Sequence, residues 1–151
     1  MLEHKIPPPI VAGLVAAAMW MVASFAPSFS LAPAVRWYAA LALAGVGVAF
    51  DLLGLIAFRR MRTTLNPLKP DQVSALVTSG IYRFTRNPMY VGFALLLTAW
   101  AVYLSALWPF LGPVMFAVYI HRFQIAPEER VMRDKFGAEY AAYAARVRRW
   151  L

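Results

Sequence analysis

Residues 80–92 read Gly80-Ile81-Tyr82-Arg83-Phe84-Thr85-Arg86-Asn87-Pro88-Met89-Tyr90-Val91-Gly92, a polar and basic stretch that leads directly into a long apolar run. Its arginine, tyrosine and asparagine side chains crowd the expected water edge of a membrane helix, where simple anchoring needs far fewer polar groups. A second polar cluster follows the last apolar segment and contains His121, Arg122, Glu128 and Glu129. We expect these two clusters to meet at the membrane surface and to form one site.

The composition is that of a membrane protein. Of the 151 residues, 62% are hydrophobic and 15% are charged, whereas soluble domains are about 45–50% apolar and about 25% charged. With no cysteine and two histidines, disulfides and thiolate metal sites are excluded and a histidine-rich metal site is not expected. The net charge of +8 borders the apolar segments, which indicates headgroup contact and not nucleic acid. We expect one domain, residues 1–151, with no metal.

The apolar segments and the turn signals between them predict an all-α integral membrane protein. It has about four transmembrane helices and a C-terminal amphipathic helix at the cytosolic face. Proline clusters mark helix starts and turns, and the final helix carries one apolar stripe between basic faces. The predicted spans are residues 10–26, 34–58, 88–104 and 108–123, and the final helix is 127–149.

The second span contains both small residues and a carboxylate. Gly45, Gly47 and Gly54 would let another helix approach closely. Asp51 lies well inside the same span, where a carboxylate is costly and normally faces protein or water. It is either a contact for a cofactor or substrate, or a structural partner for an arginine or a backbone donor.

The arginines and lysines predict the topology. They gather before the first span, between the second and third spans, and after the fourth, whereas the turn after the first span holds only Arg36. The positive-inside rule then places both termini and the loop 59–86 in the cytosol of a multi-pass protein of a bacterial inner membrane. The first span has no small-residue cleavage site after it and is interpreted as retained.

The two polar clusters suit a zwitterionic, nucleotide-like ligand. Arginines offer planar forks for a carboxylate or phosphate, and glutamates accept from an ammonium or from ribose hydroxyls. Aromatic faces attract a cation such as a sulfonium. S-adenosylmethionine combines these groups, although the same charges could form plain ion pairs. The residues concerned are Arg83, Arg86, Glu128, Glu129, Tyr82, Tyr90 and His121.

The stretch 80–92 resembles the Gly-x-Tyr-x-x-x-Arg-His-Pro-x-Tyr-x-Gly motif of the isoprenylcysteine carboxyl methyltransferase and phospholipid methyltransferase superfamily. The tail from Glu128 to Trp150 resembles the C-terminal signature of that superfamily. The resemblance covers the last half of the chain and is closest to the small bacterial members. It implies that S-adenosylmethionine is held by the C-terminal half at the cytosolic face.

Single residues have expected roles, some from the resemblance and some from the chemistry of methyl transfer. Arg86 and Glu129 are the catalytic candidates: Arg86 orients the cofactor carboxylate or an anionic acceptor, and Glu129 is a candidate base for which a ligand-holding role is favoured. Asn87 stands where the motif usually has histidine, and it cannot take up a proton near neutral pH. The expected cofactor-binding residues are Tyr82, Arg86, Asn87, Pro88, Tyr90, His121, Arg122, Glu128 and Glu129.

The expected function is therefore an S-adenosylmethionine-dependent methyltransferase that acts on a lipophilic acceptor at the cytosolic membrane face. Its acceptor would be an isoprenoid-type carboxylate, a thiol or a phospholipid amine, and the sequence does not distinguish these. The alternatives are a membrane reductase that resembles sterol reductases and uses NADPH, and a non-enzymatic membrane accessory protein. The sequence does not predict an oligomeric state.

Overall fold

The computed structural model describes residues 6–60 and 75–151. Every regular element within these residues is a helix, and the one backbone bridge among them pairs Ser28 with Ala106. The prediction of an all-α chain is therefore confirmed.

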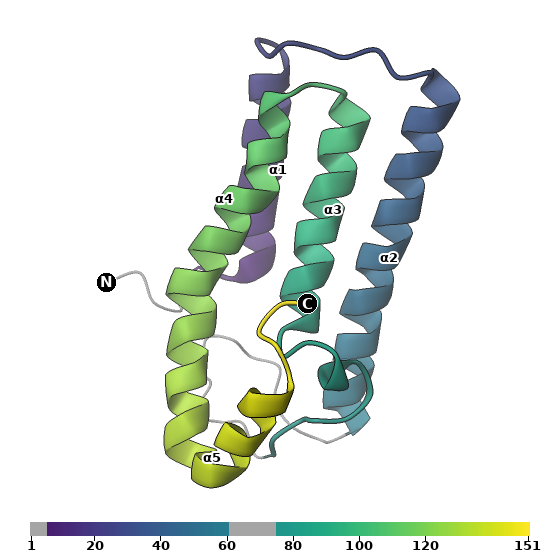
Figure 1. Cartoon of the computed structure of the whole chain (residues 1–151). Helices are drawn as coiled ribbons and strands as arrows, with labels where there is room; N and C mark the ends of the chain where they lie inside the picture. Colours follow the sequence, from purple (N-terminus) through teal and green to yellow (C-terminus); the bar gives the residue numbers. More distant parts are fainter. Residues whose placement is uncertain (1–5, 61–74) are drawn as a thin grey trace.

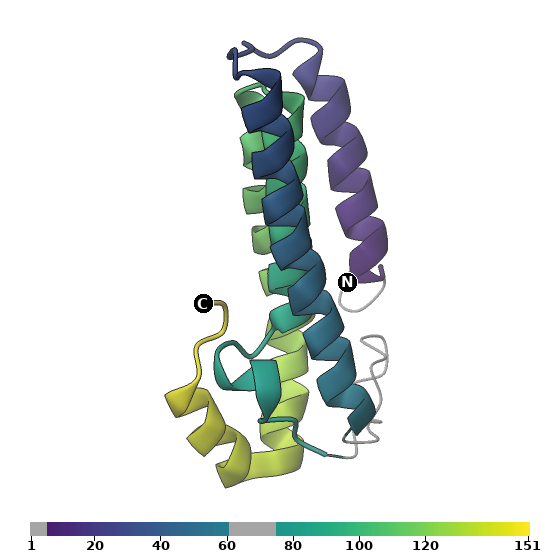
Figure 2. The same cartoon turned by 90° about the vertical axis from the view of Figure 1, so that its right-hand side faces the viewer.

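The helices form an elongated bundle with α3 at its centre (Figures 1 and 2). The helix α2 packs mainly against α3, whereas α1 packs against both α3 and α4. The elements are α1 (Pro8–Ala23), α2 (Pro33–Arg60), the 3-10 turn η2 (Gly80–Arg83), α3 (Pro88–Leu104), the 3-10 turn η3 (Trp108–Phe110), α4 (Leu111–Ile120), the π-helix η4 (His121–Ile125) and α5 (Ala126–Arg146).

Close approach of α2 and α3 depends on glycines. A Cβ atom on Gly47 would lie 2.9 Å from the carbonyl oxygen of Gly92, and one on Gly54 would also collide with α3. The side chain of Asp51 lies against Gly92, and its Oδ1 atom is buried with no hydrogen-bond partner among the described residues. The prediction of close contact is correct for Gly47 and Gly54 and wrong for Gly45, whose added Cβ would meet open space.

The fourth apolar segment and the final helix are continuous. The π-helix η4 joins α4 to α5 without a break, and α5 begins at Ala126 (Figure 1). A proline inside a helix clashes with the carbonyl four residues earlier, which for Pro127 is that of Phe123. Because Phe123 lies in the widened π turn, the helix can pass Pro127 without a break. The prediction that a new helix begins at residue 127 is therefore wrong.

The end of α5 also differs from the prediction of 127–149. Gly137 adopts a φ of 49°, which bends the helix there, and the chain then runs back toward α3 (Figure 1). A positive φ is easily adopted only by glycine. The helix ends at Arg146, and Val147 is already extended.

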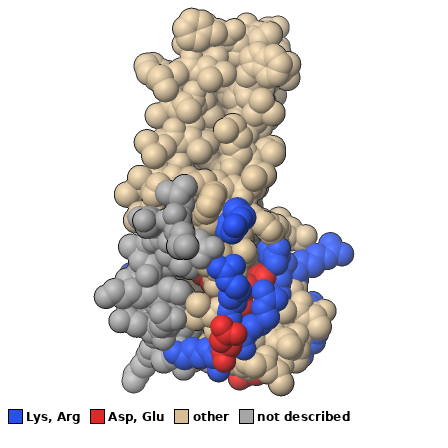
Figure 3. Space-filling model, turned by 90° about the vertical axis from the view of Figure 1, so that its left-hand side faces the viewer, with Lys and Arg blue, Asp and Glu red and all other residues tan. Residues whose placement is uncertain are grey.

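Charged side chains gather at one end of the bundle. On the face drawn in Figure 3 the upper part carries no Lys, Arg, Asp or Glu, whereas the lower part is dense in both signs. The lower end contains η2, the start of α3, and α5 (Figure 2). A chain with this division has one end suited to water and a long apolar body.

Four membrane spans are not confirmed. Among the described residues, only α2 is long and apolar enough to cross a bilayer by length and composition. The helices α1 and α3 are apolar but have 16 and 17 residues, or about 24–26 Å at 1.5 Å per residue, against about 30 Å of hydrocarbon. The predicted span 108–123 is divided among η3, α4 and η4.

Candidate functional site

Within residues 6–60 and 75–151, three segments bring together most of the polar side chains of the site. They are the loop 84–87 before α3, the first turn of α5, and residues 147–151, which we call the strap. Gly80 begins η2 with a φ of 61°, and Pro88 fixes the first turn of α3 directly after Asn87. The loop is thereby held beside the acidic first turn of α5, which contains Glu128 and Glu129.

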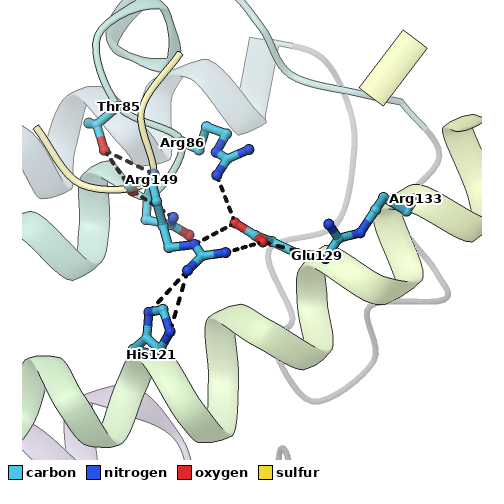
Figure 4. Close-up of polar contacts among 7 residues, drawn as sticks. Thr85, Arg86, His121, Glu129, Arg133 and Arg149 are labelled. Atoms are coloured by element: carbon cyan, nitrogen blue, oxygen red, sulfur yellow. Dashed lines mark hydrogen bonds and ion pairs between the residues drawn. The ribbon is translucent and has the colours of Figure 1, made fainter. Parts of the chain in front are cut away.

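One half of the site, which we call the arginine side, has Glu129 at its centre (Figure 4). It consists of Glu129, Arg86, Arg133, Arg149 and His121. Arg149 donates to Glu129 twice, from Nε to Oε1 at 2.8 Å and from Nη2 to Oε2 at 2.7 Å. Arg86 Nη2 lies 3.0 Å from Oε1, and Arg133 Nη2 lies 3.6 Å from Oε2. The Nη1 atom of Arg149 is also 3.3 Å from both ring nitrogens of His121.

The arginine side keeps Glu129 ionised and carries excess positive charge. The Glu129 side chain is only 6% exposed. Burial by itself raises the pKa of Glu129, but hydrogen bonding to Arg149 and the charges of Arg86, Arg149 and Arg133 hold it below its ordinary value. Three guanidinium groups surround this one carboxylate, so the cluster attracts anions.

Arg86 keeps unused hydrogen-bonding capacity. Its side chain is 13% exposed, and its Nε atom is buried without a hydrogen-bond partner among residues 6–60 and 75–151. A buried unpaired donor is costly. This N–H is therefore available to an acceptor from a ligand.

The other half of the site, which we call the tyrosine side, contains Glu128 and Tyr90, with Tyr82 and Tyr143 beside them. The hydroxyl of Tyr90 donates to Glu128 Oε1 at 2.7 Å. Burial raises the pKa of Glu128 to about 7; the hydrogen bond from Tyr90 opposes this rise, and the charge of Glu129 adds to it. Nearby, the buried hydroxyl of Tyr143 donates to the backbone carbonyl of Tyr82 at 2.7 Å. Glu128 is thus set to change its charge near neutral pH.

The strap is tied to the loop 84–87 through its backbone. The N–H of Arg86 donates to the carbonyl of Arg148 at 3.0 Å. The carbonyl of Arg149 accepts from the side-chain amide of Asn87 at 2.8 Å and from the hydroxyl of Thr85 at 3.3 Å. Thr85 is fully buried, and its hydroxyl also accepts from the backbone N–H of Asn87 at 3.1 Å.

The structure brings most of the predicted residues together at this end. Arg86 meets Glu129, Tyr90 meets Glu128, and His121 reaches the arginine side through Arg149. Asn87 instead contacts the strap.

Two of the predicted residues take other positions, and a third, Tyr82, lies at the border of the site. Pro88 is packed against α2 at Gly54. Tyr82 is buried with its ring edge-on to Phe58 at 5.4 Å, and it also lies near Glu128. Arg122 is exposed and lies over the ring of Phe123.

Sequence reasoning missed four residues of the site. Arg133 was detectable, because it lies four residues after Glu129 on the same helix. Arg149 belongs to the basic tail, but its contact with Glu129 crosses 20 residues and depends on the bend at Gly137. Thr85 and Tyr143 carry no local signal of their contacts.

An apolar groove lies at the opposite end, among α1, η3 and α4. It has a volume of about 330 Å³ and contains no titratable group, so it cannot perform acid–base chemistry. The groove is lined by Val15, Ala18, Met19, Val22, Trp108, Pro109, Leu111, Gly112 and Met115.

Among the described residues no group of three or more His, Cys, Asp or Glu side chains could hold a metal ion.

The chain is similar to known proteins over different parts of its length. An uncharacterized protein of Haemophilus influenzae is 44% identical over 63 residues, which are 42% of this chain and 100% of that protein. Protein-S-isoprenylcysteine O-methyltransferase B of Arabidopsis thaliana is 33% identical over 97 residues, covering 62% of this chain and 47% of the plant protein. A probable protein-S-isoprenylcysteine O-methyltransferase of Oryza sativa subsp. indica is 32% identical over 114 residues, covering 73% and 58%.

The chain thus spans about half the length of the plant proteins that it matches. No solved structure matches it. The model of one family, described as phospholipid methyltransferase, matches residues 35–139, which include most of α2, all of α3 and α4, and α5 as far as residue 139. The chain therefore belongs to the phospholipid methyltransferase family, and it is similar to isoprenylcysteine O-methyltransferases.

Proposed function

We propose that the protein is an S-adenosylmethionine-dependent methyltransferase that acts on a lipophilic acceptor at the cytosolic face of a bacterial inner membrane. One observation carries this proposal. In a chain of a methyltransferase family, Arg86 and Tyr90 of the motif contact Glu129 and Glu128 in a single polar site. That site lies at the end of an apolar bundle, where a water-soluble cofactor and a lipid can both arrive.

The side chains of the site fit the charged groups of this cofactor. The buried Nε–H of Arg86, which has no acceptor among the described residues, suits its carboxylate. An ionised Glu128 would attract its ammonium or sulfonium group, and the rings of Tyr90 and His121 offer flat polar surfaces. When bound, S-adenosylmethionine supplies an already activated methyl group, so the protein has mainly to align donor and acceptor.

The two glutamates suit different tasks. Glu129 is a poor proton acceptor, because guanidinium groups occupy both of its oxygens and hold its pKa low. We assign it to holding Arg86 in place and not to general base catalysis. Glu128, with a pKa of about 7, is the better group to accept a proton from an amine. A carboxylate or thiolate acceptor would need no base.

The apolar body suits a bilayer. Large apolar side chains on the outer faces of α2 and α4 are exposed, including Leu41, Leu52, Val114 and Val118. We propose that α1, α2, α3 and the α4–η4 segment cross the membrane, the shorter helices locally thinning the bilayer. The basic end then faces the cytosol, as the positive-inside rule requires, and the acceptor enters sideways between the helices.

The test is calorimetry on detergent-purified protein. We expect heat of binding with S-adenosylmethionine and with its demethylated product, and none with NADPH. Arg86→Ala and Glu128→Ala should each weaken binding at least tenfold, whereas Arg59→Ala, which removes a charge from the exposed end of α2, should not. A folded protein that binds neither methyl donor nor product would refute the proposal.

The acceptor can be identified separately. Lipid extracts incubated with the protein and an isotopically labelled methyl donor should contain one labelled species by mass spectrometry. The labelled group would distinguish a methyl ester, a thioether and a methylamine.

A further inference from the structure

The strap holds Arg149 in a fixed position over the site. Three hydrogen bonds tie the carbonyls of Arg148 and Arg149 to Thr85, Arg86 and Asn87. Two of the three go to the carbonyl of Arg149 itself. The backbone at this residue is therefore fixed by the same loop that carries the motif arginine.

The guanidinium of Arg149, whose backbone is fixed in this way, binds the carboxylate of Glu129 as a bidentate pair. Both oxygens of the carboxylate accept from it, at 2.8 and 2.7 Å. A bidentate pair of this kind fixes the plane of the carboxylate as well as its position. Arg86 then contacts one of those two oxygens, at 3.0 Å, so the orientation of Arg86 depends on how Arg149 holds Glu129.

Asn87 has a place in this chain of contacts that its motif position does not suggest. Its side-chain nitrogen donates to the carbonyl of Arg149 at 2.8 Å. That bond directs the amide toward the strap, and through Arg149 it links the Asn87 side chain to Glu129.

We propose that Arg149 is a positioning residue of the cofactor site and that Asn87 acts on the site through Arg149. This inference rests on the proposed function, because it assigns the arginine side to cofactor binding. Arg149 sets the Glu129 carboxylate, Glu129 sets Arg86, and Asn87 sets the backbone of Arg149. Asn87, which stands where the motif usually has histidine, thereby links the loop 84–87 to Arg149. This link needs a hydrogen-bond donor and not a titratable proton.

The test is a double-mutant cycle on the affinity for S-adenosylmethionine, measured by calorimetry. We expect Arg149→Ala to weaken binding about thirtyfold and Asn87→Ala about tenfold. If Asn87 acts through Arg149, the double variant should bind no more than about twofold worse than Arg149→Ala alone. Independent effects, about three-hundredfold in the double variant, would overturn the proposal, as would full affinity in Arg149→Ala.

Two further variants separate positioning from charge and from folding. Arg149→Lys keeps the charge but cannot bridge both oxygens, so it should restore only part of the affinity. Arg148→Ala removes the same charge from the exposed neighbouring side chain and should change affinity less than twofold. If Arg149→Ala does not fold, the cycle is run with Arg149→Met, which keeps most of the side-chain stem but cannot donate to Glu129; additive losses overturn the proposal equally.

The cycle also distinguishes the two proposals. Absence of binding in the folded wild-type protein would refute the function. Binding in the wild type with additive effects in the variants would refute only the role of Arg149 and Asn87.

Discussion

The arginine side and the tyrosine side begin from neighbouring residues of one helix. Glu129 meets three guanidinium groups and stays ionised, whereas Glu128 meets a tyrosine hydroxyl and has a pKa of about 7. Successive residues on an α-helix point about 100° apart, so the two carboxylates face different elements of the fold. Their chemistry is therefore set by their partners and not by their residue type.

The difference divides the work of the site. A carboxylate gripped by arginines is a fixed structural charge, and a carboxylate beside a hydroxyl can respond to pH and to a ligand. Pairs of titratable groups whose pKa values are pushed apart are typical of sites that need both functions. Variants of the two sides should reveal this difference between Glu128 and Glu129, and the largest effect is expected at Glu129.

Replacing Glu129 should cause the greatest loss. Glu129→Ala leaves three guanidinium groups facing each other around a buried position. We expect a loss of about 3 kcal/mol in the free energy of unfolding and at least about a hundredfold in cofactor affinity. Thermal unfolding in detergent and calorimetry would measure the two effects. Glu139→Ala, an exposed residue of the same helix, is the matched control; equal behaviour of the two variants would remove Glu129 from the centre of the site.

Replacing Glu128 should change the pH dependence. Below about pH 7 Glu128 is protonated and neutral, and above it Glu128 is ionised, so affinity for the cationic cofactor should rise as the pH increases through 7. Glu128→Gln should flatten this profile, binding about tenfold worse at pH 8 and equally well at pH 5.5. The groups that face Glu128 are Tyr90, Tyr82 and Glu129. Calorimetry across this range tests the prediction, and an unchanged profile in the variant would contradict it.

Removing one hydroxyl from the tyrosine side should have a smaller effect. Tyr90→Phe deletes the 2.7 Å hydrogen bond that stabilises the ionised form of Glu128. The pKa of Glu128 should rise further, so the midpoint of the binding profile should move to higher pH and affinity at pH 7 should fall about threefold. Tyr119→Phe is the control, since that hydroxyl has no hydrogen-bond partner within the described residues. A midpoint that moves to lower pH would contradict the assignment.

The smallest effect is expected at the edge of the arginine side. Arg133 is more than half exposed, and its contact with Glu129 is 3.6 Å long. Exposed ion pairs contribute about 0–1 kcal/mol, so Arg133→Ala should weaken cofactor binding less than twofold at physiological salt. A loss as large as that of Arg149→Ala would show that the three arginines act as equals.

The sequence allowed the helices and the meeting of the two clusters to be predicted. Pro88 starts α3 as expected, α1 begins at Pro8 within two residues of the predicted start at residue 10, and the contact between Arg86 and Glu129 joins the motif to the acidic turn. The helix starts are local features. The meeting of the clusters could be predicted because one cluster precedes an apolar helical hairpin in the sequence and the other follows it.

The remaining features depend on tertiary structure. The contact of Arg149 with Glu129 requires the bend at Gly137 and the hydrogen bonds of the strap. The glycine marks a place where the helix can bend, but neither the direction of the bend nor the bonding of the strap has a sequence pattern of its own. Tyr82 borders the tyrosine side, but its burial against Phe58 follows from tertiary packing that its residue type does not indicate. Asp51 remains without an assigned role; its buried oxygen lies against Gly92.

The π-helix between α4 and α5 has a consequence for how far this family architecture tolerates changes in length. A π turn holds one residue more than the α turn that it interrupts, so deleting a single residue from His121–Ile125 would restore regular winding. The wide turn takes up that residue locally, so the side chains beyond it would keep roughly their present directions, and Glu128 and Glu129 would still face their present partners. A relative with regular winding at this place would therefore carry its acids one residue nearer to the proline motif in sequence and keep them on the same sides of the helix.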